Sequence, residues 1–267
     1  MPLAVCATPI GNLEDVTLRV LRELAEADVV LAEDTRHTRG LLERHGIRAR
    51  LLSYHEHNEA KRTAELLPRL QAGERLALVS DAGLPGISDP GARLVAAALE
   101  AGVPVTVLPG PSAVETALVA SGLVGERYQF IGYLPRGERA LTELGKELAG
   151  WQWPVVAFES PQRLPRSLTV LARVAPDRSC AVCRELTKRH EEVALGTVAE
   201  LAERFGEPVR GEVTLVLGAA PPREPSGEEA AAAVAELVEA GVPRRQAAEL
   251  VARLTGASRN ALYRGSL

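Results

Sequence analysis

Short apolar runs rich in β-branched residues alternate with longer helical patterns through the first 110 residues of the chain. The runs predict five strands, over 3–7, 28–32, 49–54, 75–80 and 103–108. Apolar residues at helical spacing predict four helices between them, over 16–27, 35–46, 57–72 and 89–101. A regular alternation of strand and helix indicates a parallel sheet that is covered by helices on both faces. The first half of the chain is therefore predicted to be an α/β domain.

The pattern changes after the Pro/Gly-rich segment 109–112. Further strands are predicted over 128–134, 153–158, 179–184, 191–196 and 212–218, with helices over 137–148, 163–174 and 197–205. The strand at 191–196 follows its predecessor too closely for a crossover helix, which predicts a mixed sheet that contains a hairpin. The sequence Thr197-Val198-Ala199-Glu200 has the form of a capping box and predicts a helix start at that point.

The last 49 residues have the composition of a linker followed by a small helical unit. Residues 219–225 are rich in Ala and Pro, and Ser226-Gly227-Glu228-Glu229 has the form of a second capping box. Helices are predicted over 226–240 and 243–254, with a third within 257–267, as in a helix-turn-helix unit. We therefore expect three domains, over 1–111, 112–220 and 226–267. The third contains a group of arginines at positions 244, 245, 253, 259 and 264. They form either a nucleic-acid contact or the solvated face of a helical hairpin that packs on the body.

Composition excludes several classes of protein. The sequence contains no stretch of 18 apolar residues without a charged residue, which excludes a membrane-spanning helix. The first residues lack the basic start of a signal peptide. A cytoplasmic protein without a membrane partner is expected. The net charge of −4 means that a nucleic-acid partner would have to meet a local basic surface.

The cysteines and histidines give little support to a metal site. Three cysteines, an odd number, argue against a disulfide framework. Cys180 and Cys183 form a C-x-x-C that is typical of zinc or redox sites, but no second such pair exists and both fall in a strand-like run, as does Cys6. His55 and His57 flank Glu56 without a third ligand. We expect core cysteines and no metal.

Polar loops follow the predicted strands of the first half. The usual nucleotide-binding and hydrolase motifs are absent: G-x-x-x-x-G-K-[ST], G-x-G-x-x-G, H-E-x-x-H and G-x-S-x-G. The loops lie at 8–15, 32–38, 53–58, 80–91 and 109–113. Ligands bind at the carboxyl ends of strands in open α/β sheets, so the five loops predict a site at this edge.

Eight strings in these loops and in the second half form a recognisable series. In chain order they are ATPIGNLEDVTLR, AEDTRHTRGLL, HEHNE, VSDAGLPGISDPG, LPGPSA, GYLPR, ESPQRL and RELTKRHEE. Together they resemble the small-subunit ribosomal RNA methyltransferase I family, a branch of the tetrapyrrole methylases. The resemblance runs from Leu3 to about Gly218. The end of the chain, with Asn260-Ala261-Leu262-Tyr263, resembles the family's C-terminal helix-turn-helix.

The resemblance implies a fold and an activity. The fold has a parallel-sheet N-terminal domain, a mixed-sheet second domain and a small helical appendix. The activity is transfer of a methyl group from S-adenosylmethionine to the ribose 2′-hydroxyl of a cytidine in the decoding region of 16S rRNA, with the 30S subunit as partner and a homodimer as the working form. The cofactor would lie in the cleft between the two α/β domains. The residues that the resemblance implies for it are Ile10, Asp81, Leu84, Ser112, Ala113, Phe158, Cys183 and Gly211 or its neighbour Glu212.

The chemistry requires a group that accepts the proton of the ribose hydroxyl. Polar residues are densest after the second strand, so Glu33 and His37, with Asp34, are the first candidates, followed by His55 and Glu159. Alternatively, this cluster caps the following helix and binds substrate without proton transfer. Candidate RNA contacts are Arg36, His55, Arg136, Arg163, Arg184 and Lys188, since cations bind phosphate.

Two other functions stay open from the sequence. One is C-methylation of a cobalamin-type or other tetrapyrrole precursor, which shares the fold and the cofactor. Relatives of that kind carry a G-x-G-P-G-D first loop, from which residues 7–12 depart. The other is a DNA-binding regulator in which residues 226–267 read DNA and the body senses a ligand.

Overall fold

The computed structural model describes residues 2–220 and 227–265 of the chain. Residues 1–219 form one compact unit and residues 220–267 form a second. The first unit contains two five-stranded sheets, which fall within the predicted ranges 1–111 and 112–220. No helix in the described part of the chain combines the length and the apolar character needed to cross a bilayer.

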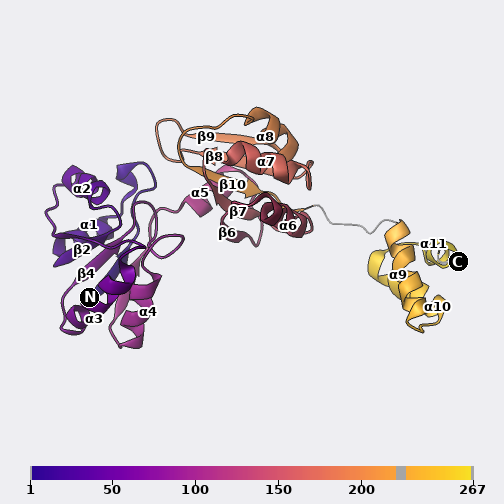
Figure 1. Cartoon of the computed structure of the whole chain (residues 1–267), viewed down its shortest axis with the longest axis horizontal. Helices are drawn as coiled ribbons and strands as arrows, with labels where there is room; N and C mark the ends of the chain where they lie inside the picture. The colour runs from indigo at the N-terminus through magenta and orange to yellow at the C-terminus, as the bar shows by residue number, and fades with distance from the viewer. Residues whose placement is uncertain (1, 221–226, 266–267) are drawn as a thin grey trace. The chain divides into compact units, whose positions relative to one another are not determined.

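The first sheet is wholly parallel, as predicted. Its strands are β1 (Leu3–Cys6), β2 (Val29–Ala32), β3 (Leu51–Ser53), β4 (Leu76–Val79) and β5 (Val105–Leu108). Their order is β3-β2-β4-β1-β5, and each neighbouring pair is parallel. Each strand is shorter than predicted, because the pattern cannot show where pairing stops. The strand order places the loops after β2, β4 and β1 side by side (Figure 1).

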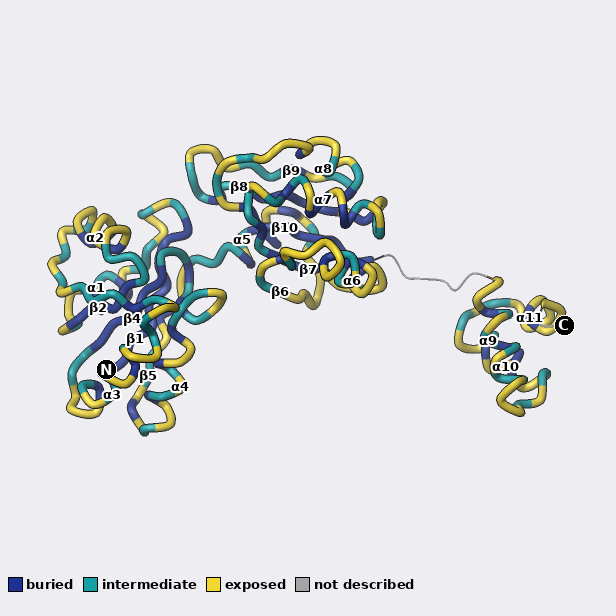
Figure 2. Tube along the Cα trace, in the orientation of Figure 1, coloured by how far each residue is buried: buried dark blue, intermediate teal, exposed yellow. Residues whose placement is uncertain are grey.

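Helices cover both faces of this sheet, which confirms the second part of the prediction. They are α1 (Leu18–Glu26), α2 (Thr35–Arg44), α3 (Glu59–Gln71) and α4 (Ala92–Glu100), with a short 3₁₀ turn, η1 (Leu13–Asp15). Alternate strand residues point to opposite faces, so Leu3 packs with residues of α3 and α4 while Ala4 packs with residues of α1 and α2. The central strands are buried on both sides as a result (Figure 2).

The second sheet is mixed and contains the predicted hairpin. Its strands are β6 (Gln129–Tyr133), β7 (Val155–Glu159), β8 (Ser179–Arg184), β9 (Glu192–Thr197) and β10 (Val213–Leu217), in the order β6-β7-β10-β8-β9. Only β6 and β7 are parallel, and β8 and β9 form the hairpin. Helices α6 (Glu138–Ala149), α7 (Leu164–Ala172) and α8 (Val198–Arg204) pack on one face. The capping box at Thr197 and Glu200 is present at the start of α8.

Helix α5 (Ala113–Ala120) was not predicted from the sequence. Its side chains are apolar over most of its surface, so it lacks the one-sided pattern that marks a surface helix. Val114, Ala117 and Leu118 pack against the face of the second sheet that α6, α7 and α8 leave uncovered, whereas Val119 is exposed although it is apolar. Its first turn follows the Pro-Gly-Pro-Ser segment directly and therefore begins at the carboxyl edge of the first sheet.

The C-terminal unit is helical, with α9 (Gly227–Glu239), α10 (Arg244–Thr255) and α11 (Arg259–Gly265). Small apolar residues form its own core, among them Ala230, Val234, Ala247 and Leu262. Most of the predicted linker 219–225, and Ser226 of the second predicted capping box, lie outside the described residues.

The three cysteines lie in the interior, which confirms the interpretation of them as core residues. Cys6, Cys180 and Cys183 are buried and free, and burial raises the pKa of each thiol to about 12. They are inert as nucleophiles at neutral pH. Across residues 2–220 and 227–265, no group of three or more His, Cys, Asp or Glu side chains is arranged to hold a metal ion.

Candidate cofactor and methyl-transfer site

One cavity of about 490 Å³ lies where the carboxyl edge of the first sheet faces the second sheet. Four of the five predicted loops line it: 8–15, 32–38, 80–91 and 109–113. The loop at 53–58 contributes no lining residue. The remaining wall comes from β6, β7, β8 and β10 and from the turns beside them. The cavity is large enough for a cofactor or drug-sized ligand.

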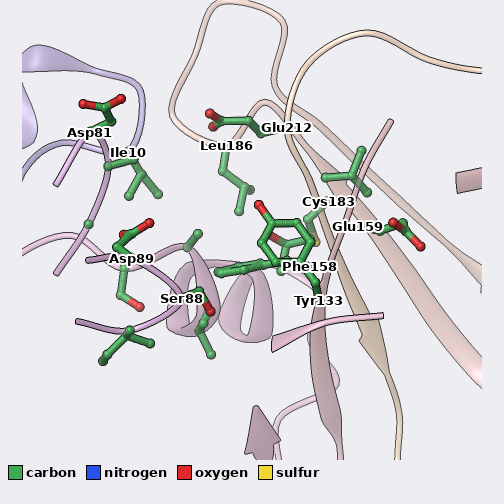
Figure 3. Close-up of a pocket in the computed structure, with 18 of the residues that line it drawn as sticks. Ile10, Asp81, Ser88, Asp89, Tyr133, Phe158, Glu159, Cys183, Leu186 and Glu212 are labelled. Carbon is green, nitrogen blue, oxygen red and sulfur yellow. The ribbon is translucent and has the colours of Figure 1, made fainter. Parts of the chain in front are cut away.

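The residues that the family resemblance implied for the cofactor all line this cavity. They are Ile10, Asp81, Leu84, Ser112, Ala113, Phe158, Cys183 and Gly211, together with Glu212. Figure 3 shows Ile10, Asp81 and Asp89 on one side and Tyr133, Phe158 and Cys183 on the other. The fold thus gathers positions as far apart as Ile10 and Glu212 around one cavity, and their role as cofactor ligands stays a prediction.

Hydrogen bonds join the loops after β1, β2 and β4. The backbones of Thr8 and Gly83 exchange two hydrogen bonds, at 2.8 and 3.1 Å, and the Thr8 hydroxyl donates to the Ser80 carbonyl at 3.0 Å. The Asp34 N–H donates to Asp81 Oδ1 at 3.0 Å. These long-range bonds hold three loops in one arrangement, so the edge of the sheet is a preformed surface.

Loop 80–91 follows an irregular path that brings Asp89 to the cavity. Ser88 has a φ of +63°, which is uncommon for a residue with a side chain. Gly91 has a φ of +137°, and a Cβ there would lie 2.8 Å from Leu78 Cδ2, so only glycine fits. Strained positions of this kind persist where the surrounding structure fixes them, and they are typical of ligand sites.

Three carboxylates, Glu33, Asp81 and Asp89, line the side of the cavity formed by the first sheet, and we call them the carboxylate wall. Burial, followed by the negative charge of Glu33, raises the pKa of Asp89 from 3.8 to about 7. Burial, followed by the charge of Asp81, also raises the pKa of Glu33 above its ordinary value. No ion pair with any of the three is found among the described residues. The wall therefore carries negative charge that a cationic ligand would compensate.

The opposite side carries aromatic and apolar side chains, together with the carboxylates of Glu159 and Glu212, which are paired with Arg163 and Lys188. The rings of Phe130 and Phe158 meet edge to face at 4.9 Å, and Tyr133 meets Phe158 at 5.5 Å. Leu186 and Val213 continue this surface. We call Tyr133, Phe158, Leu186 and Val213 the aromatic wall, which stands on the side of the cavity opposite the carboxylate wall.

The loop at 185–191 comes from the second sheet and contacts the first loop. The Thr187 hydroxyl accepts from the Asn12 N–H at 2.9 Å. A Cβ on Gly11 would lie 2.5 Å from Lys188 Cγ and 2.8 Å from the Leu186 carbonyl oxygen, so the contact requires glycine. Glu185 and Thr187 have φ values of +53° and +64°, which marks the loop as tightly constrained. This contact joins the two loops next to Ile10 and Leu186, which both line the cavity.

The predicted proton acceptors are placed differently from one another. Glu33 lines the cavity, whereas His37 is exposed and is not part of its lining. Asp34 caps α2 by accepting from the Arg36 N–H at 2.8 Å, and it pairs with the Arg36 side chain at 2.7 Å. That pairing holds the pKa of Asp34 well below its usual range. Asp34 therefore caps α2, as in the capping alternative, and of the three first candidates only Glu33 lines the cavity.

The six candidate RNA contacts lie outside the cavity lining, and four of them are engaged in ion pairs. Arg36 pairs with Asp34, Arg163 with Glu159, Arg184 with Glu192, and Lys188 with both Glu185 and Glu212. Arg136 is exposed. His55 is half-buried, and its Nε2 lies 3.1 Å from the Asn58 amide nitrogen.

Glu159, a secondary candidate for proton transfer, has a different set of partners. Its side chain is buried, accepts from the Ser167 hydroxyl and pairs with Arg163 at 2.5 Å. Figure 3 shows its carboxylate turned away from Asp81 and Asp89. These partners favour a structural role for Glu159.

Asp89, Tyr133 and Leu186 line the cavity but were not singled out from the sequence. Each lies within a motif that was noted: SDAGLPGISDPG, GYLPR and RELTKRHEE respectively. Asp89 could have been predicted as a cavity residue, because it is a carboxylate in a Gly/Pro-rich loop that follows a strand. Tyr133 could have been noted because the chain has only four tyrosines.

The cavity fits the chemistry of S-adenosylmethionine. That molecule has a flat adenine, two cationic groups and one carboxylate. The aromatic wall suits the adenine, and the carboxylate wall suits the cations. The first turn of α5, which lines the cavity at Ser112, Ala113 and Val114, presents N–H groups that suit a carboxylate.

Comparison with known families gives matches over nearly the whole chain. Residues 2–202 match the family of tetrapyrrole (corrin/porphyrin) methylases, and residues 224–265 match the RsmI C-terminal HTH domain. A ribosomal RNA small subunit methyltransferase I from Mesorhizobium japonicum is 44% identical over 98% of this chain and 90% of its own. The protein of the same name from Synechocystis is 43% identical over 99% of this chain and 97% of its own.

Solved structures show the same fold at lower identity. A uroporphyrin-III C-methyltransferase from Thermus thermophilus is 25% identical with a TM-score of 0.58, over 81% of this chain and 93% of its own. A second structure of that name and organism, complexed with S-adenyl homocysteine, is 20% identical with a TM-score of 0.58. The match covers 81% of this chain and 96% of that structure's own chain. The predicted fold, with parallel-sheet and mixed-sheet halves and a helical appendix, is confirmed.

Proposed function

Because the chain belongs to the ribosomal RNA small subunit methyltransferase I family of tetrapyrrole methylases, we propose that it methylates the ribose 2′-hydroxyl of a cytidine in the decoding region of 16S rRNA, with S-adenosylmethionine as methyl donor. The observation that carries the proposal is the cavity in which the carboxylate wall faces the aromatic wall. The first wall provides proton acceptors, and the second provides a surface for planar groups.

The residues around the cavity bind and orient the two reactants. Asp81, Ile10 and Leu84 would hold the cofactor from the first sheet, and Phe158, Cys183 and Gly211 from the second. When bound, the cofactor supplies an electrophilic methyl group on a sulfonium. Such a transfer is an in-line displacement, so most of the rate enhancement comes from positioning. The constrained loops 80–91 and 185–191 provide this positioning and exclude water.

Glu33 and Asp89 are the proposed proton acceptors. A ribose hydroxyl is a weak acid, and its proton must leave as its oxygen gains the methyl group. The raised pKa of Asp89, near 7, matches a group that accepts a proton at neutral pH, and ionised Glu33 keeps it basic. We treat the two as a pair, because neighbouring carboxyl groups titrate together. A positioned base of this kind contributes about 10²- to 10⁴-fold.

RNA contacts are proposed for basic residues that surround the cavity without lining it, among them Arg36 and Arg136. The C-terminal unit adds arginines, of which Arg245, Arg253, Arg259 and Arg264 are exposed. Each phosphate contact makes binding weaker at higher salt. Deleting residues 220–267 is expected to reduce the salt dependence of rRNA methylation, and an unchanged slope would show that this unit does not bind RNA. We also propose a homodimer, which the family resemblance implies, and a cytoplasmic location on the 30S subunit.

A second candidate acceptor is a tetrapyrrole, because the solved structures with this fold include uroporphyrin-III C-methyltransferases. The first loop, residues 7–12, lacks their glycine-rich pattern, and the relatives that are 43–44% identical are named for rRNA. The same relatives favour an enzyme over a DNA-binding regulator.

A comparison of the two acceptors, each supplied separately, tests the proposal. Purified protein and labelled S-adenosylmethionine are given either 30S particles from a host that lacks this activity or uroporphyrinogen III. We expect label in RNA and none in the tetrapyrrole. Label only in the tetrapyrrole would reject the rRNA reaction while keeping the cofactor cavity.

A further inference from the structure

Tyr133 places an aromatic ring at the open side of the cavity. The residue lines the cavity, yet 61% of its surface is exposed. Tyr128, Trp153 and Tyr263 are also exposed, at 39–43% of their surface, so Tyr133 is the most exposed of the chain's aromatic residues. Figure 3 shows the ring standing between Asp89 on one side and Cys183 on the other.

The backbone holds this ring in place. The pairing of β6 with β7 shifts its register between Phe130 and Tyr133, at Gly132, whose φ is +70°. Directly after the ring, the Leu134 N–H donates to the Phe158 carbonyl oxygen at 3.0 Å. A bulge of this kind turns a side chain away from the ordinary pleat. The sheet therefore aims Tyr133 at the cavity mouth.

Phe158 supports the ring from one side only. The two rings meet edge to face at 5.5 Å with an angle of 63° between their planes, and Phe130 packs behind Phe158 at 4.9 Å. No other ring contact of Tyr133 occurs among the described residues. With most of its surface exposed, the tyrosine ring has room for a planar partner.

We propose that Tyr133 stacks on the base of the nucleotide that is methylated and thereby places its ribose beside Glu33 and Asp89. This inference rests on the proposed function and names a positioning residue for it. A ribose inside a stacked RNA strand cannot reach a cavity between two sheets, so the nucleotide has to be turned out of its stack. A turned-out base is stabilised by stacking on an aromatic side chain.

The charges around Tyr133 agree with this placement. Burial, followed by the negative charge of Asp89, raises the pKa of the Tyr133 hydroxyl, which indicates that the carboxylate lies close to the ring. A base that rests on the ring would therefore present its sugar to the carboxylate wall. The other planar group with access to this ring is the adenine of the cofactor, and the experiment separates the two.

The test compares three variants: Tyr133→Phe, Tyr133→Leu and Tyr133→Ala. The measurements are kcat and KM for 30S particles from a host that lacks this activity, and the Kd of S-adenosylmethionine by calorimetry. Tyr133→Phe retains a flat face, so we expect kcat/KM for 30S within about threefold of wild type. Both other variants are expected to lose about 5- to 150-fold, the range that stacking of one base supplies. The Kd of S-adenosylmethionine is expected to stay within about twofold.

Trp153→Ala is the matched control, because Trp153 is an exposed aromatic residue that does not line this cavity. It is expected to keep wild-type kcat/KM. If Tyr133→Leu were as active as Tyr133→Phe, the ring would only fill space and the inference would be wrong. A parallel rise in the Kd of S-adenosylmethionine would assign the ring to the cofactor instead. Absence of transfer by wild-type protein would reject the proposed function, and this inference with it.

Discussion

Replacing Asp89 with asparagine removes a charge that the folded chain holds at a cost. Burial and the charges of Glu33, Asp81 and Glu212 raise the pKa of Asp89 from 3.8 to about 7. A hydrogen bond from Ser80 acts in the opposite direction but does not outweigh them. The folded state therefore binds more protons than the unfolded state between these two values, so stability falls as the pH rises through this window. Asparagine has no such charge. The variant should be more stable than wild type, and its advantage should grow with pH up to about 7.

The size of this effect follows from the shift. Because Asp89 ionises with a pKa of about 7 in the folded state and 3.8 in the unfolded state, the free energy of unfolding falls by about 2.5 kcal/mol between pH 5 and pH 8 if the shift acts without screening. The carboxylate is partly open to water, so about half of this, roughly 1.3 kcal/mol, is expected. For a chain of this size that corresponds to a rise of about 3–5 °C in the Tm difference between variant and wild type.

Thermal unfolding of both proteins without cofactor, at pH 5, 6, 7 and 8, measures this difference. Asp177→Asn, which removes an exposed carboxylate, is the control. Methyl transfer by Asp89→Asn should drop by about 10²-fold or more, since a proton acceptor is lost. A Tm difference that does not change from pH 5 to pH 8 would show that Asp89 is ionised throughout, and the argument for the pair would fail.

Three further predictions test other parts of the site. Gly11→Ala should weaken S-adenosylmethionine binding at least about tenfold in calorimetry, because a Cβ would push loop 185–191 away. The control is Gly40→Ala, whose Cβ meets no atom within 4 Å; it should keep the affinity and add about 0.5–1 kcal/mol to the free energy of unfolding. Equal affinities of the two variants would contradict the contact between Gly11 and the loop. Arg163→Ala leaves the buried Glu159 carboxylate without its cation and should lower the free energy of unfolding in urea by about 2–4 kcal/mol. Arg166→Ala, at an exposed ion pair, should lower it by about 0.5 kcal/mol or less. Similar losses in the two variants would refute a structural role for Glu159. Finally, kcat/KM for S-adenosylmethionine should fall as the pH drops below about 7, because protonated Asp89 cannot accept a proton, and this limb should disappear in Asp89→Asn; a flat wild-type profile from pH 5.5 to 8 would remove Asp89 from the reaction.

The sequence was sufficient to predict the fold because its patterns are local. Alternating strands and helices specify a parallel sheet, and the short interval between β8 and β9 specifies a hairpin. Helix α5 was missed because its exposed residues Val119 and Ala120 are apolar as well, which removes the amphipathic signal. The bounds predicted for β8 are confirmed, and the other helix and strand ends differ from the prediction by at most three residues. Helix α3, for example, starts at Glu59 because Asn58 accepts from the His55 N–H and forms a turn there.

The site was predictable to the level of its loops but not of its side-chain partners. Parallel strands place successive loops at one edge, so the positions of Ile10, Asp81 and Ser112 followed from topology and family resemblance. The grouping of Glu33 with Asp89 depends on the path of loop 80–91 through Ser88, which no pattern specifies. Ion pairs such as Lys188 with Glu212 join residues 24 positions apart through the fold. Sequence patterns of charge do not show them.

The identity of the methylated atom tests the central claim most directly. RNA from 30S particles treated with the protein and S-adenosylmethionine is digested to nucleosides, and the methylated product is identified by mass spectrometry and then mapped to a position. The account predicts a single 2′-O-methylcytidine in 16S rRNA, formed about 10²-fold or more slowly when Glu33→Gln protein is used. A methyl group on a base carbon or nitrogen, or wild-type yield from Glu33→Gln and Asp89→Asn alike, would contradict it.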